Sequence, residues 1–137
     1  MGNTHDLRMA NATVNDEAAA LAALAENGYI RIYDGSRPAT ANTAIGSQVK
    51  LAELRFGAPA FGAPVNGVIT ANAITPDISA DATGTASWFR VLEDDGTTPL
   101  WDGEAGTAGA DLILNSVAIG AGSQVSITSL VHTVPKQ

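Results

Sequence analysis

The sequence has 137 residues, no cysteine, and seven basic against fourteen acidic residues, which gives a net charge of −7. This length is that of one domain, and without cysteine neither a disulfide framework nor a thiolate metal site can form. No apolar run reaches the roughly 18 residues that a membrane span needs, so we expect no membrane-spanning segment. No base occurs between Arg90 and Lys136, so this acidic half would repel phosphates, and we expect no nucleic-acid binding.

The chain begins with a segment, residues 1–13, in which no hydrophobic periodicity is visible. We expect a flexible N-terminal arm there, because the segment has no regular apolar face to bury. No linker-like stretch interrupts residues 14–137, which we expect to form a single domain. Within this domain the patterns predict a helix over 14–27 and a β-sandwich over 28–134.

The predicted helix, VNDEAAALAALAEN, carries signals for both of its ends. Asn15 can cap its N-terminus, and an Asn-Gly pair follows its last turn. Its narrow apolar stripe consists of Ala18, Leu21, Leu24 and Ala25. The stripe can pack within the same domain or against a neighbouring copy, so Leu21 and Leu24 are candidate interface residues.

From Tyr29 onwards, short segments with strand patterns alternate with turn residues. Asp95-Gly96 is a strong tight-turn pair and predicts a hairpin around it. The predicted strands lie in YIRIYD, QVKLAELRF, GVITANAI, SWFRVLE, TPLWD, ADLILNS and SQVSITSLVHTV. Seven or eight strands with one helix at the start favour an all-β fold, a single β-sandwich or jelly-roll-like domain.

The composition predicts a thin core, because only 5% of the residues are aromatic and small residues dominate. Small side chains bury little apolar area each, so the few large ones should anchor the core disproportionately. The core anchors that we expect are Phe56, Trp88, Phe89 and Trp101. Association with a partner would supply burial that such a domain lacks on its own.

The sequence offers no pattern for catalysis or for metal binding. The two histidines, His5 and His132, stand in no ligand spacing, and no GxSxG elbow precedes a helix. Glu93-Asp94-Asp95 supplies too few alternating acids for a calcium loop and is better explained as a turn. We therefore expect no catalytic residue, no metal and no cofactor, and we do not expect an enzyme.

The segment YDGSRP ends the first strand and opens a long loop of small residues. Asp34-Gly35 predicts a turn, and Pro38 fixes the outgoing chain. Arg37 is the one base in this loop, and it can form a salt bridge to a nearby acid or contact a partner. Together with Tyr33, at the end of the strand, it is a candidate interface residue.

Four segments carry a family resemblance: GYIRIYDGSRPATANTAI, LAELRFGAPAFG, GVITANAI and ADATGTASWFRVLEDDGTTPLWDG. Together they resemble small proteins that tailed phages and prophages encode in structural gene blocks, near the major capsid protein. The resemblance covers most of residues 15–134, and YIRIYDG-RPA and WFRV are its most distinctive parts. It implies a virion structural protein, with capsid decoration or cementing of the head as the specific role, and it brings no catalytic residues.

The resemblance also implies the major capsid protein as partner and the capsid surface as location, after synthesis in the bacterial cytoplasm. A homo-oligomer is expected, and a trimer would match a local threefold axis, while the arm could become ordered on binding. Two other classes stay open. A tail or baseplate protein would also be β-rich, and a carbohydrate-binding module would use an exposed Trp88 or Trp101 as a stacking platform.

Overall fold

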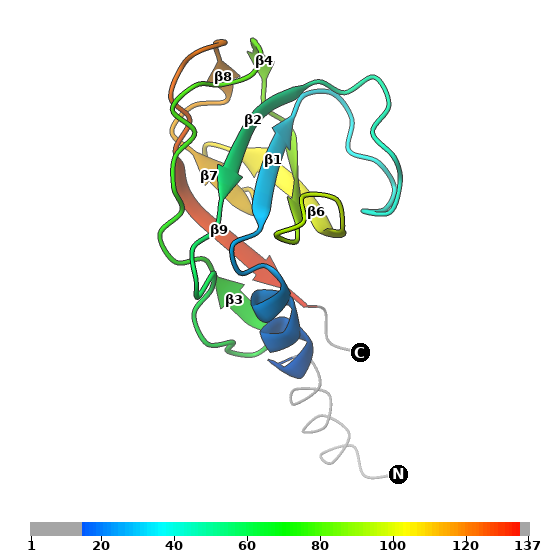
Figure 1. Cartoon of the computed structure of the whole chain (residues 1–137), viewed down its shortest axis with the longest axis vertical. Helices are drawn as coiled ribbons and strands as arrows, with labels where there is room; N and C mark the ends of the chain where they lie inside the picture. The colour runs from blue at the N-terminus through cyan, green and yellow to red at the C-terminus, as the bar shows by residue number, and fades with distance from the viewer. Residues whose placement is uncertain (1–14, 135–137) are drawn as a thin grey trace.

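A computed structural model describes residues 15–134 of the chain, and the predicted arm at 1–13 lies outside this range. Figure 1 shows a mostly β structure with one short helix, which confirms the predicted all-β class. In the described range, nine strands form one sheet of seven strands and one of two. The strands are β1 (Tyr29–Tyr33), β2 (Lys50–Arg55), β3 (Val68–Thr70), β4 (Gly84–Thr85), β5 (Trp88–Leu92), β6 (Pro99–Gly106), β7 (Leu112–Leu114), β8 (Ala118–Ile119) and β9 (Ile127–Thr133).

The strands of the large sheet follow the order β2-β1-β5-β6-β7-β9-β3. Neighbouring strands are antiparallel, apart from β6 and β7, which pair in parallel. Strands β4 and β8 pair with each other in the small sheet. This arrangement is consistent with an all-β sandwich, but the order does not confirm a jelly roll.

The large sheet folds over, so that its two edges approach each other. Figure 1 shows β7 behind β1 and β2, and β9 running below their lower ends. Beyond β3 the chain reaches the other edge, where the Thr75 N–H donates to the Arg55 carbonyl at 3.3 Å. The main hydrophobic core includes one or more residues from most strands, among them Ile30, Leu54, Ile69, Phe89, Leu112 and Leu130.

The helix covers residues 15–24 in the described range and packs within the domain, one of the two predicted alternatives. Ala18 and Ala25 are fully buried, and Leu21 packs against the core, whereas Leu24 is 46% exposed. The helix ends at residue 24, three residues before the predicted end at 27, and residues 25–27 form a turn in which Asn27 adopts a left-handed φ of 58°.

The predicted capping role of Asn15 is wrong. Its Oδ1 accepts a hydrogen bond from the Gly67 N–H at 2.7 Å, so this side chain ties the helix to a distant turn. That turn precedes β3 and joins Val65 to Val68, whose backbone N–H and C=O groups bond to each other in both directions. The side-chain oxygen therefore satisfies a turn amide rather than an amide of its own helix.

Candidate functional site

A long loop, residues 34–49, connects β1 to β2 and projects from the sheet at one side of the molecule (Figure 1). Its two ends are held together, because Asp34 Oδ1 accepts a hydrogen bond from the Val49 N–H at 2.6 Å. The Trp88 indole N–H donates to the Asp34 carbonyl at 3.0 Å and attaches the loop to β5. The base of this loop is therefore fixed by residues of three different segments.

A buried ion pair holds the middle of the same loop. Arg90 on β5 meets Asp102 on β6 in a two-pronged contact, with Nε–Oδ1 at 2.7 Å and Nη2–Oδ2 at 3.0 Å. The two side chains are only 7% and 6% exposed. Arg90 Nη2 also lies 3.4 Å from the Thr40 carbonyl, and its guanidinium lies 5.4 Å from the centre of the Trp88 ring. The loop thus rests on a pair of charges that water hardly reaches.

Between this loop and β6 lies a cleft of about 300 Å³. Its lining combines the polar residues Thr40 and Asp102 with small or apolar residues, namely Pro38, Ala39, Ala41, Leu100 and Trp101. Arg37 also lines the cleft, and its side chain is 44% exposed. Arg37 Nε lies 3.4 Å from Glu104 Oε2, so the predicted salt bridge is confirmed, and the predicted partner contact stays a prediction.

The predicted interface role of Tyr33 requires an exposed side chain, but Tyr33 is buried. It is 5% exposed, and its ring stacks on Trp88 with centroids 4.6 Å apart and planes at 15°. Both rings lie under the loop rather than in the main core. The alternation of YIRIYD could not show this burial, because the covering residues come later in the chain.

The four predicted core anchors are all buried. Trp88 and Phe89 are fully buried, Phe56 is 4% exposed, and Trp101 is 8% exposed. Trp101 packs between Phe61 and His132, with ring centroids at 5.9 and 4.2 Å. Neither tryptophan therefore presents a ring face to solvent, as a sugar-stacking platform would need.

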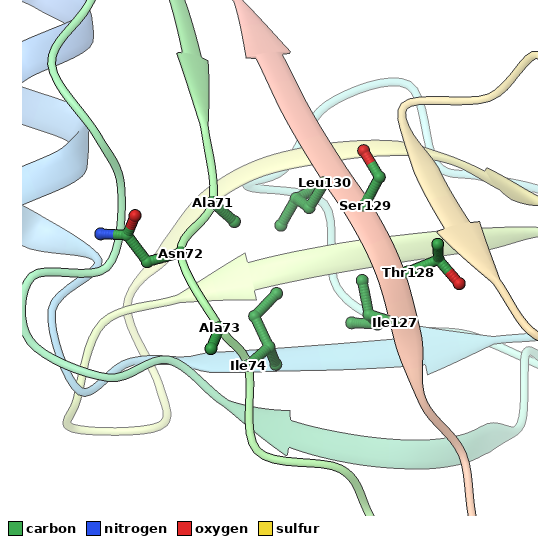
Figure 2. A pocket seen from close by; sticks show the side chains of 8 residues that line it. All are labelled: Ala71, Asn72, Ala73, Ile74, Ile127, Thr128, Ser129 and Leu130. Atoms are coloured by element: carbon green, nitrogen blue, oxygen red, sulfur yellow. The ribbon is translucent and has the colours of Figure 1, made fainter.

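A second, smaller hollow of about 160 Å³ lies between β9 and the segment that follows β3 (Figure 2). The two segments are joined by the Ala71 N–H and the Leu130 carbonyl at 2.9 Å, and they diverge beyond this bond. Figure 2 shows Ile74 and Ile127 on the facing sides of this gap. No charged side chain lines the hollow, so it offers only shape and small polar groups to a ligand.

The acidic cluster Glu93-Asp94-Asp95 forms the predicted turn between β5 and β6. Asp95 accepts hydrogen bonds from the Thr98 hydroxyl at 2.6 Å and from the Thr98 and Thr97 amides at 2.9 Å. These bonds, led by that of the Thr98 hydroxyl, hold the pKa of Asp95 well below its usual range. The carboxylate is therefore engaged in fixing the turn.

Within residues 15–134, no three His, Asp or Glu side chains gather as ligands for one metal ion. In the same range, no helix has the length and apolarity to span a bilayer. Comparison with protein-family models, with curated proteins and with solved structures finds no match to this chain.

Proposed function

We propose that the protein is a structural component of a phage virion, and that it decorates the head by binding the major capsid protein. The observation that carries this proposal is the loop 34–49, which is fixed at its base and has one long contact to Arg90 at its middle, while most of its small residues stay exposed. A loop that is already ordered loses little conformational freedom when it docks, which favours binding. The resemblance of the surrounding sequence to phage structural proteins supplies the class of partner.

The role that we infer is a binding role without catalysis. Three polar contacts of the site serve to hold the loop or the strands beneath it: Arg90 with Asp102, Asp34 with Val49, and Trp88 with the Asp34 carbonyl. A decoration protein needs such a fixed surface, since its contacts repeat over the lattice and add up by avidity. The acidic surface favours solubility at the high concentration that lattice coverage requires.

The test is co-sedimentation of the purified chain with empty, expanded heads of the phage whose structural genes encode it. We expect binding that saturates at a copy number compatible with the capsid lattice. Ala44→Glu places a charge at the exposed part of the loop and should weaken binding, whereas Ala108→Glu, in an exposed turn after β6, should not. Folded protein that does not bind heads would refute the proposal, and binding to isolated tails instead would support the tail alternative.

A further inference from the structure

The segment of residues 77–81 has one large apolar side chain that is exposed to solvent. Ile78 is 79% exposed, more than the other exposed large hydrophobic residues of the described range. The backbone on both sides is fixed: Asp77 and Val125 bond in both directions at 3.0 and 2.7 Å, and the Asp81 N–H donates to the Leu51 carbonyl at 2.8 Å. A fixed apolar projection of this kind can enter a pocket at a small cost in conformational entropy.

The same segment carries two acids and no base. The Asp77 carboxylate accepts hydrogen bonds within its own copy, from the Ser79 and Glu53 backbone N–H groups at 3.0 Å each. Asp81 is more available: its side chain is 45% exposed, and its contact with Lys50 Nζ is long, at 3.4 Å. The segment therefore presents an isoleucine with a half-exposed carboxylate three residues further on.

The cleft beside the loop 34–49 complements this pair of groups. Pro38, Ala41 and Leu100 give the cleft an apolar part that suits an aliphatic side chain, beside the polar Thr40 and Asp102. Arg37 lies at the cleft with one long contact to Glu104, while its guanidinium has five N–H donors. A second carboxylate could therefore bind Arg37 without displacing a strong pair.

We propose that the chain associates with a second copy of itself, with Ile78 of one copy in the cleft of the next and Asp81 against Arg37. The two surfaces lie on different parts of one copy, because the projection adjoins β2, the cleft adjoins β6, and β1 and β5 separate these strands. The contact therefore joins unlike surfaces. Copies joined in this way form a closed ring if the rotation closes and an open chain if it does not.

The first test is sedimentation velocity of the full chain over a wide range of concentration. We expect the mass to rise above the 13.9 kDa of one copy as concentration increases. Ile78→Ser and Arg37→Ser should each weaken association by about tenfold or more, as expected for central contacts. Val65→Ser is the matched control, because Val65 is also exposed, at 66%, but lies in the turn before β3. A chain that stays monomeric throughout, or an Ile78→Ser variant that associates as the wild type does, would overturn the proposal.

A mixture of the two variants tests the geometry of the contact. Ile78→Ser copies keep the cleft, and Arg37→Ser copies keep the projection, so one intact contact can form between two unlike copies. We expect an equimolar mixture to form dimers and no larger species, while each variant alone associates about tenfold or more weakly than the wild type. A mixture that stays monomeric under conditions where the wild type associates would show a different contact and refute the proposal. Neither outcome depends on binding to heads, so this inference and the proposed function can fail separately.

Discussion

The buried pair of Arg90 and Asp102 should contribute far less to stability than the loss of either partner would suggest. Arg90→Met leaves the Asp102 carboxylate, 6% exposed, without a cation, and should lower the free energy of unfolding by about 3–5 kcal/mol. Asp102→Leu should cost somewhat less, because the guanidinium keeps the Thr40 carbonyl and the Trp88 ring. The double variant removes both charges and should lie within about 2 kcal/mol of the wild type, since buried pairs gain little over apolar replacements.

Equilibrium unfolding in urea of the wild type, the two single variants and the double variant measures the coupling energy directly. We expect a coupling of about 3 kcal/mol or more for this pair. Arg31 and Glu53 supply a control on neighbouring strands, with a short contact of 2.6 Å but side chains that are 25% and 30% exposed. Their coupling should stay below about 1 kcal/mol. A double variant whose loss of unfolding free energy equals the sum of the losses of the two single variants would refute the argument. It would show that removing one partner does not leave the other charge buried and unpaired at a cost.

Two further predictions concern Trp101 and His132, which stack on each other in the core region. Trp101→Ala should lower the free energy of unfolding by about 3–5 kcal/mol, measured in urea, because the ring is 8% exposed and also packs on Phe61; an unchanged stability would contradict its role as an anchor. Burial lowers the pKa of His132 below 6.5, while Asp111 acts in the opposite direction. Stability from the neutral imidazole should therefore be complete above about pH 6.5 and should be lost as the pH falls through the lowered pKa. NMR titration of His132 checks this, since a midpoint at or above 6.5 would contradict it, and Asp111→Asn should lower the midpoint further.

The positions of most strands could be predicted because their residues follow local rules. Alternation marked β1, and Asp95-Gly96 marked the hairpin, where Gly96 has a φ of 72°. The two-residue strands β4 and β8 were missed, since two residues show no periodicity. The tight turn at Asn66-Gly67 was also missed, although Asn-Gly is a strong hairpin signal and both residues have positive φ.

The candidate site was predictable only in part, because its contacts join segments far apart in the sequence. The loop and Arg37 could be identified from composition, but Glu104 could not be named as the acid that Arg37 meets. All five residues of β5 are buried, which simple alternation does not predict for a strand with one solvent face. The loop 34–49 covers the second face of this strand, so tertiary structure overrides the local pattern.

A single extra residue in β6 decides which side chains form the site. Next to the turn, Leu92 pairs with Pro99. Farther from the turn, from Val91 back to Trp88, the pairing is shifted by one residue, so that Leu100 has no partner on β5 and forms a bulge. Without the bulge, each later residue of β6 would move to the opposite face. Arg90 would then face Trp101 rather than Asp102.

The bulge therefore places three residues on the faces that suit them. It lets Trp101 enter the main core and brings Asp102 opposite Arg90 beneath the loop. It also places Gly103 opposite Phe89, where a Cβ would lie 2.6 Å from the ring, so that only glycine fits there without movement. In the unshifted register, Phe89 would face Asp102, a carboxylate without its cation in the core, which is far more costly. The register of one hairpin thus produces both the anchor of the core and the ion pair that holds the binding loop.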